Sequence, residues 1–225
     1  MNTYLDGEGG VFMEKSYTKI YTTGATVPLK IRPGHFATNH AHINYYIDVT
    51  TLKARTKEAE EVAQALVGMY LYDPGIDTIV CMEGTEVIGA FLAEELAKGG
   101  FLSTNAHKSI YVISPEFNNN SQIIFRDNLI PMIRDKHVMI LMASVTTGRT
   151  LNKAVESIQY YGGILQGASA IFSAMDSLDG VPIKSVFGKK DLPDYTYSDY
   201  RDCPLCKAGK KIDALVNTFG YSPMG

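Results

Sequence analysis

Strand-like and helix-like patterns alternate along residues 56 to 173. Short apolar runs of the length expected for buried strands occupy residues 77–82, 109–114, 138–142 and 164–173. Between these runs, apolar residues recur at helical spacing in stripes over residues 56–70, 87–98 and 151–158. Alternation of this kind predicts an α/β fold in which helices flank a parallel sheet.

Further elements are expected on either side of this region. Residues 1–26 are mixed in character and are expected to form a partly ordered arm that leads to a short strand near residues 17–22. Strands are also predicted over residues 44–49 and 183–187, and a turn at Pro33-Gly34. Apolar residues at helical spacing predict a terminal helix; they are Ile212, Leu215, Val216 and Phe219.

The loop after the 138–142 run carries the first candidate chemistry. It reads Thr146-Thr147-Gly148-Arg149-Thr150 and lies between a predicted strand and a predicted helix. The first N–H groups of a helix lack internal partners and lie at the positive end of its dipole, and glycine lets a ligand approach the backbone. The loop is therefore a candidate phosphate site. The alternative is that Thr146 or Thr147 only caps the helix.

Composition narrows the functional classes. The chain has 225 residues, of which 45% are hydrophobic and 20% charged, and a formal net charge of −3. These values are ordinary for a globular protein, and the charge implies no general attraction to nucleic acid. No apolar run reaches membrane-spanning length, and the first 20 residues lack the apolar segment of a signal peptide. Together with only three cysteines, these features predict a cytoplasmic protein without a disulfide framework.

The stretch from His137 to Tyr161 resembles the phosphoribosyl-diphosphate (PRPP) motif of type I phosphoribosyltransferases. In that family an apolar strand is followed by two acidic residues, two apolar residues and Thr-Thr-Gly-x-Thr. This chain keeps the strand and the tail of the motif but has Met142 and Ala143 at the acidic positions, which hold the ribose hydroxyls in the family. The resemblance assigns 5′-phosphate and substrate binding to Ser144, Thr146, Thr147, Gly148, Arg149 and Thr150.

A second part of the resemblance is to the N-terminal hood of orotate phosphoribosyltransferases. There a Leu-Lys pair precedes a strand that ends in Tyr-Tyr-Ile-Asp, a pattern that Leu29-Lys30 and Tyr45-Tyr46-Ile47-Asp48 match. The resemblance places Lys30 near the diphosphate, and Tyr45 and Tyr46 beside the base. It also matches Glu83-Gly84-Thr85 to the diphosphate-binding loop, for which an ordinary tight turn is the alternative.

The resemblance implies a type I phosphoribosyltransferase fold with an arm and hood over residues 1–50, an α/β core over 51–190 and a tail over 191–225. A hairpin around residues 115–122 corresponds to a mobile flap, which carries cations in active orotate enzymes. Here the loop offers Glu116 and three asparagines, with Arg126 near its end. Flap cations neutralise the departing diphosphate, so this departure bears on catalysis, as does that of the acidic pair.

Cysteines and histidines raise the question of a metal site. The tail segment Cys203-Pro204-Leu205-Cys206 is half of a zinc ribbon or a redox pair, with a plain turn as the alternative. His35, His40 and His42 fall within eight residues, where solvated or base-contacting roles are the alternative to a metal. We expect no metal ligands in this set. The alternative is zinc at Cys203 and Cys206, completed by two histidines, for example across a dimer.

Two main functional hypotheses follow. The first is an enzyme resembling orotate phosphoribosyltransferase, which attaches phosphoribosyl from PRPP to a pyrimidine-type base with Mg²⁺ and forms a homodimer. No residue is assigned as catalytic, because this chemistry proceeds by positioning and charge neutralisation. The second is a sensor of the same fold that binds PRPP or a nucleoside monophosphate without turnover. A third is transfer to another acceptor with the help of His107, Arg126 or Arg149.

Overall fold

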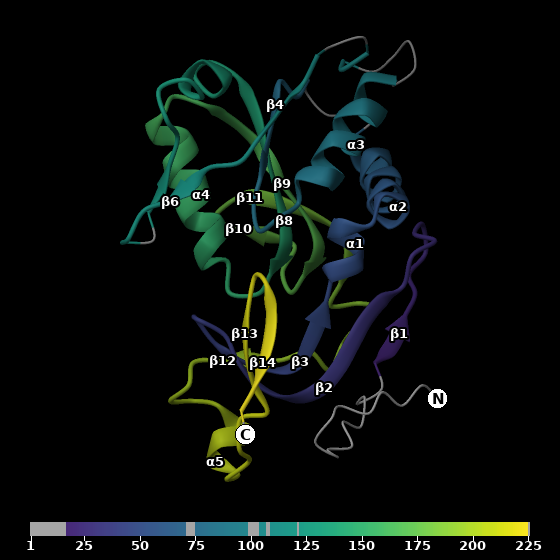
Figure 1. Ribbon diagram of the computed structural model, residues 1–225, viewed down its shortest axis with the longest axis vertical. Coiled ribbons are helices and arrows are strands. Elements are labelled where there is room, and N and C mark those ends of the chain that lie inside the picture. The colour runs from purple at the N-terminus through teal and green to yellow at the C-terminus, as the bar shows by residue number, and fades with distance from the viewer. Residues whose placement is uncertain (1–16, 71–74, 99–103, 107–108, 121, 225) are drawn as a thin grey trace, which may run out of the picture.

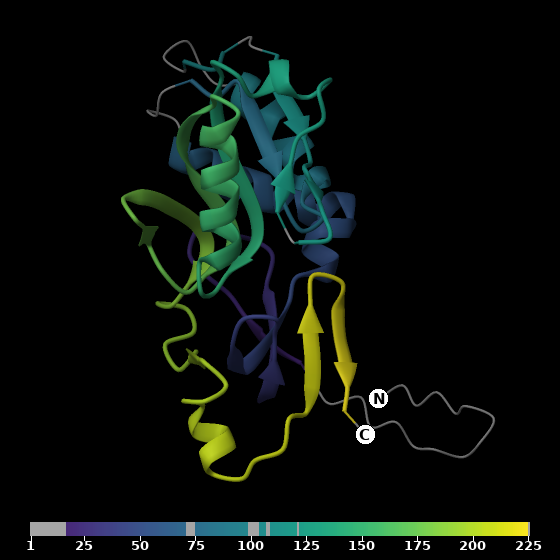
Figure 2. The same cartoon turned by 90° about the vertical axis from the view of Figure 1, so that its left-hand side faces the viewer.

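The strands of the described residues form two six-stranded sheets and a short hairpin (Figure 1). The computed structural model describes residues 17–70, 75–98, 104–106, 109–120 and 122–224. One sheet forms the α/β core and the other forms a smaller hood at one end of it (Figures 1 and 2). Most of the expected N-terminal arm lies outside the described residues.

The core sheet has the strand order β10-β11-β9-β8-β4-β5. Its strands are β4 (Thr78–Cys81), β5 (Tyr111–Ile113), β8 (His137–Val145), β9 (Ile164–Ser173), β10 (Ser177–Leu178) and β11 (Val181–Gly188). Every neighbouring pair is parallel except β10 with β11. The prediction of a parallel sheet with intervening helices is confirmed.

Helices cover both faces of this sheet, with α4 on one face and α2 and α3 on the other (Figure 1). The helical segments are α1 (Thr50–Ala54), α2 (Thr56–Val67), η1 (Gly68–Tyr70), α3 (Glu86–Lys98), η2 (Ile130–Met132), α4 (Arg149–Tyr160) and α5 (Pro204–Lys207). None of the helices in the described ranges is both long and apolar enough to cross a membrane.

The side chains of β8 explain why helices are needed on both faces. Successive residues of a strand point to opposite sides. Met139 and Leu141 pack in the cluster that includes the buried stripes of α2 and α3. Ile140, between them, packs in the cluster that includes the buried stripe of α4. A strand that is apolar on both sides must be covered on both sides, which holds the end of β8 rigidly in the centre of the sheet.

The hood sheet has the order β12-β3-β2-β13-β14, and β1 also pairs with β2. Its strands are β1 (Thr18–Ile20), β2 (Leu29–Ala37), β3 (His42–Asp48), β12 (Tyr197–Ser198), β13 (Ala214–Asn217) and β14 (Gly220–Pro223). The C-terminal tail thus joins the N-terminal hood: β12 pairs with β3, and β13 runs parallel to β2.

Two predictions for the hood and tail are wrong. Pro33-Gly34 is not a turn but lies inside β2, at an irregularity in the pairing with β3 between Pro33 and Phe36. The expected terminal helix is the antiparallel hairpin β13–β14. Ala214 is buried and Leu215 is exposed, so burial alternates with the period of a strand. Phe219 is 95% exposed and belongs to no buried stripe.

The hairpin in the flap position is formed by β6 (Glu116–Phe117) and β7 (Ile123–Ile124), as the sequence predicts. Arg126 lies just after it, and its Nε and Nη2 atoms donate hydrogen bonds of 2.9 and 2.6 Å to Glu116 Oε2. This exposed ion pair neutralises the arginine with an acid from the same hairpin.

Candidate functional site

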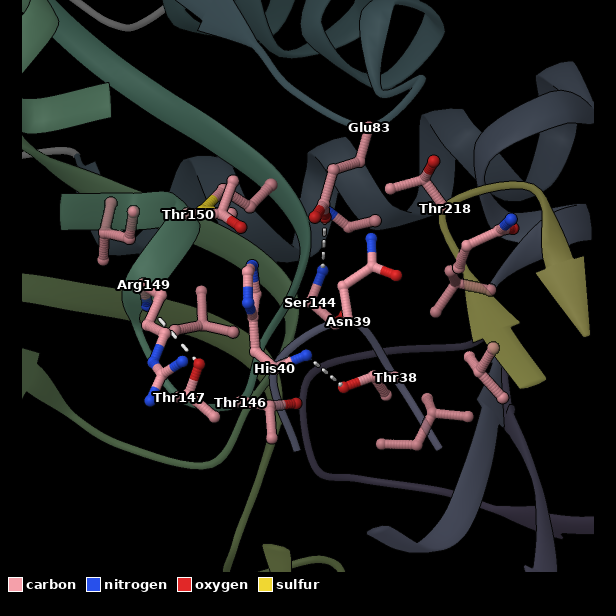
Figure 3. A pocket seen from close by; sticks show the side chains of 18 of the residues that line it. Thr38, Asn39, His40, Glu83, Ser144, Thr146, Thr147, Arg149, Thr150 and Thr218 are labelled. Atoms are coloured by element: carbon pink, nitrogen blue, oxygen red, sulfur yellow. Dashed lines mark hydrogen bonds between the residues drawn. The ribbon is translucent and has the colours of Figure 1, made fainter. Parts of the chain in front are cut away.

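A pocket of about 200 Å³ lies where the carboxyl ends of β4 and β8 meet the hood (Figure 3). Its walls come from residues 142–151, from Glu83, from hood and α1 residues between 38 and 53, and from Val216, Asn217, Thr218 and Gly220 at the tip of the β13–β14 hairpin. Parallel sheets bind ligands beyond the carboxyl ends of their strands. The pocket therefore occupies the position at which this architecture can present loops and helix ends to a ligand.

The start of α4 forms one wall. Gly148 is the N-cap and has a φ of +74°, a conformation that favours glycine. A Cβ atom here would lie 2.9 Å from the side chain of Leu178, so space also favours glycine. Among the residues that the structure describes, no side chain caps this helix; the Arg149 N–H lies 3.5 Å from Thr147 Oγ1, at the outer limit of a hydrogen bond. The first amides of α4 are thus left to bind an anion.

The loop before α4 is held in place by a buried tyrosine. Thr146 Oγ1 lies 3.0 Å from the hydroxyl of Tyr195, which is buried in the tail segment. Burial raises the pKa of Tyr195 to about 12, so its hydroxyl is protonated at neutral pH. Arg149, by contrast, is exposed and lines the pocket, where it supplies a positive charge next to the helix start (Figure 3).

Glu83 is the one acid among the described residues that line the pocket. Its Oε2 atom accepts hydrogen bonds from the backbone N–H groups of Ala143 and Ser144, at 3.2 and 3.3 Å (Figure 3). Burial raises the pKa of the carboxyl group, and these N–H groups together with Lys53 oppose the rise. The backbone of Glu83 has a φ of 60°, a strained conformation that is common at functional sites.

Lys53 joins three parts of the site. Its Nζ atom donates hydrogen bonds to the carbonyl oxygens of Glu83, at 2.6 Å, and of Thr218, at 3.2 Å. The side chain therefore connects α1 to the loop after β4 and to the hairpin tip. Burial lowers its pKa, and neighbouring carboxylates, with that of Glu83 first, oppose the change. An ammonium group has three donors, so one remains for a ligand.

The turn between β2 and β3 closes the hood side of the pocket. Thr38 Oγ1 accepts hydrogen bonds from the N–H groups of His40, at 3.2 Å, and Ala41, at 3.0 Å, which fixes a tight turn (Figure 3). Burial, followed by the nearby charges of Arg149 and Lys153, lowers the pKa of His40. The imidazole is accordingly neutral at physiological pH and offers a hydrogen-bonding edge to the cavity.

Most of the substrate-binding residues expected from the sequence line this pocket: Tyr46, Glu83, Ser144, Thr146, Thr147, Gly148, Arg149 and Thr150. Lys30, Tyr45, Gly84 and Thr85 do not line it. Thr85 is fully buried, and its hydroxyl donates to the carbonyl oxygens of Met82 and Leu141, so it holds the loop in place.

Sequence reasoning missed Lys53 and the hairpin tip at residues 216–220. Lys53 carried no signal, because it lies just beyond the stretch that resembles the hood. The hairpin was hidden by apolar residues that also fit a helix. At the end of β8, Met142 and Ala143 are buried, as apolar residues should be. A carboxylate oxygen from the neighbouring loop, Glu83 Oε2, accepts a hydrogen bond from the Ala143 N–H.

The short helix α5 lies at the end of the hood remote from the core (Figure 1), and a second cluster of side chains lies beside it. His35, His42, Cys203 and Cys206 each bring one potential metal-binding atom to within 4.8 Å of the others. His40, the remaining histidine of that stretch, lines the pocket instead. Two motifs that are separate in the sequence therefore meet within one chain.

Comparison with known proteins identifies the fold. No protein-family profile and no curated protein sequence matches the chain. Among solved structures, an orotate phosphoribosyltransferase from Mycobacterium tuberculosis aligns at 15% identity with a TM-score of 0.50, over 73% of this chain and 92% of its own. The UMP synthase of Leishmania donovani aligns at 18% identity with a TM-score of 0.52, over 72% of this chain but 34% of its own. The chain therefore has the type I phosphoribosyltransferase fold.

Proposed function

We propose that this chain, built on the type I phosphoribosyltransferase fold, binds PRPP and transfers its phosphoribosyl group to a pyrimidine-type base, as orotate phosphoribosyltransferases do. The observation that carries the proposal is the uncapped start of α4 at Gly148, which opens into the pocket. Free amides at a helix start, a flanking Arg149 and hydroxyl groups from Thr147 and Thr150 form a site suited to a 5′-phosphate.

The other walls have matching roles. Lys53 provides a cation on the side of Glu83, where a diphosphate would lie opposite the 5′-phosphate. Tyr46 and neutral His40, both from the hood, border the space left for a base. The chain would act by holding PRPP and base in line and by offsetting the charge of the departing diphosphate, without a protein nucleophile.

Magnesium is part of the expected chemistry, because Mg²⁺ ions bind substrate phosphates together with one or two carboxylates. The residues present are a poor fit. Glu83 is the one acid among the described lining residues, and its Oε2 atom is already bound by two backbone amides. Met142 and Ala143 contribute no oxygen from their side chains. Any Mg²⁺ would be held mainly by oxygens of PRPP.

Two observations favour a second candidate, a sensor that binds PRPP or a nucleoside monophosphate without turnover. The apolar pair Met142-Ala143 cannot hold the ribose hydroxyls. Arg126, the cation closest to the flap in sequence, is paired with Glu116. Both changes remove charged side chains that would stabilise the transition state. They leave the proposed phosphate site at the start of α4 intact.

Calorimetric titration tests the proposed phosphate site at the start of α4. PRPP and uridine 5′-monophosphate should each bind, and uridine should bind at least tenfold more weakly because it lacks the phosphate. Thr147→Ala should weaken the phosphate-bearing ligands, whereas the matched control Thr51→Ala, on α1 outside the pocket, should leave their affinity unchanged. If PRPP and the monophosphate both fail to bind, the transferase and the sensor are rejected together.

Diphosphate release then separates the two candidates. The protein is incubated with PRPP, Mg²⁺ and a panel of pyrimidine and purine bases. Base-dependent diphosphate release supports the transferase and identifies its acceptor. Tight binding of PRPP without release for any base supports the sensor. The homodimer implied by the resemblance is tested separately, by sedimentation of the protein with and without PRPP.

A further inference from the structure

The cluster of His35, His42, Cys203 and Cys206 has the composition of a structural zinc site. His35 lies in β2, His42 begins β3, and the two cysteines flank the first turn of α5. Two cysteines and two histidines form a common closed ligand set for Zn²⁺, with no position left for water or substrate. The pair of cysteines is separated by two residues, which is the usual spacing in such sites.

The distances match a tetrahedral ion. Zn–N bonds of about 2.0 Å and Zn–S bonds of about 2.3 Å at tetrahedral angles place N and N about 3.3 Å apart and N and S about 3.5 Å apart. Here His35 Nε2 lies 3.1 Å from His42 Nδ1, 3.5 Å from Cys203 Sγ and 3.6 Å from Cys206 Sγ. His42 Nδ1 lies 3.2 Å from Cys206 Sγ.

A hydrogen bond to His35 fixes which of its ring nitrogens can bind a metal ion. His35 Nδ1 lies 2.9 Å from the carbonyl oxygen of Lys210, which can only accept, so Nδ1 carries the proton. In the neutral ring this leaves one lone pair on Nε2, facing His42 and both thiols. One lone pair cannot satisfy three neighbours through hydrogen bonds, whereas an ion between them satisfies all four groups. A second-shell carbonyl of this kind is typical of histidine ligands of zinc.

The sulfur of Cys203 is buried and also has polar neighbours. The backbone N–H groups of Cys206 and Leu205 and the hydroxyl of Ser198 donate hydrogen bonds to it. Hydrogen bonds of this kind orient a metal-binding side chain.

We infer that His35, His42, Cys203 and Cys206 bind one structural Zn²⁺ ion, which fastens the C-terminal tail to the hood. Binding converts both thiols to thiolates and releases their protons to solvent. The site continues directly into the pocket wall, because the Asp213 N–H donates to the His35 carbonyl and β13 begins at the next residue. The ion thus sets the position of the hairpin whose tip, at residues 216–220, lines the pocket. This inference does not depend on the proposed function.

Metal analysis of the full chain, purified without a histidine tag and under reducing conditions, is the first test. We expect about one equivalent of zinc. Cys206→Ser, at the exposed ligand, should reduce the zinc content at least tenfold. Cys81→Ala is the matched control, since Cys81 is buried in β4 and is not in the cluster, and it should keep the full equivalent.

Two further measurements guard against a variant that fails to fold. Wild-type protein stripped with a chelator and reloaded with Co²⁺ should show the intense visible bands of tetrahedral cobalt bound by thiolates. Hydrogen exchange should show that chelation exposes the amides of residues 213–223 while those of β8 and β9 stay protected. The inference is overturned if the untagged protein takes up no zinc or cobalt when both thiols are free, or if Cys206→Ser retains the full equivalent.

Discussion

Replacement of Gly148 by alanine is the most direct test of the proposed phosphate site at the start of α4. The φ of +74° is unfavourable for any residue with a Cβ atom, at a cost of roughly 1–2 kcal/mol. The new Cβ would also lie 2.9 and 3.0 Å from the two terminal carbons of Leu178. Those atoms end a flexible side chain, so they can shift, and the backbone conformation should dominate the loss of stability. We expect Gly148→Ala to lower the free energy of unfolding by about 1–2 kcal/mol.

The effect on binding should be separable from the effect on stability. If the α4 amides hold the phosphate, displacement of residue 148 moves them, and affinity for PRPP should fall at least tenfold, which corresponds to about 1.4 kcal/mol. Gly180→Ala is the matched control. Gly180 has a φ of +83° with no atom within 4 Å of the new Cβ, and it does not line the pocket. It should lose similar stability without losing affinity.

Denaturant unfolding and calorimetric titration of both variants give the two quantities. Gly68→Ala gives the reference for a glycine replacement without strain, because Gly68 has helical angles and open space around it. This variant should be more stable than the wild type by about 0.4–1 kcal/mol. The reasoning is refuted if Gly148→Ala binds PRPP as tightly as the wild type. It is also refuted if Gly180→Ala loses affinity to the same extent, since the effect would then be global.

Three other predictions follow from the site. Lys53→Met removes the hydrogen bonds to the carbonyl oxygens of Glu83 and Thr218, so it should lower the free energy of unfolding by about 1–2 kcal/mol in denaturant. It should also weaken PRPP binding. Unchanged stability and affinity would exclude the bridging role of Lys53. The raised pKa of Glu83 means that the folded state disfavours its ionised form. Wild-type stability should therefore fall as pH rises above the ordinary value of 4.5, and Glu83→Gln should reduce this fall in unfolding midpoints measured across that range. Glu116→Gln should release Arg126 and speed diphosphate release from PRPP without a measurable change in stability, because the pair is exposed; a slower reaction would argue against a role for that arginine.

The core could be predicted because its signals are local. The apolar run of β8, the glycine at residue 148 and the stripe that begins at Leu151 each fix conformation through neighbours in the sequence. The same region therefore predicted the strand, loop and helix that the structure has, and with them the parallel sheet. Glu83 lines the pocket for a related reason, since its loop follows a buried strand of the same sheet.

The hood and tail could not be predicted in the same way, because long-range pairing decides them. Ser198 pairs with His42, which brings the tail cysteines to the hood histidines across more than 150 residues. Nothing in either segment specifies that pairing. The hairpin at 214–223 adds to β2, and that contact outweighs an apolar spacing that also fits a helix. The role of Lys53 can be recognised only in the folded structure, where the carbonyl groups of Glu83 and Thr218 lie close together.

The pairing of β13 with β2 has a consequence for biosynthesis. Residues 36 and 37 of β2 pair with β3 on one edge; on the other edge they pair with residues 214 and 215, which are synthesised after β11, the last strand of the core sheet. Until then, that part of β2 is an open sheet edge, a template for pairing with other chains. The nascent protein should therefore be prone to aggregation at the hood until residues 214 and 215 pair with β2, and the pocket should be complete only when this hairpin is in place.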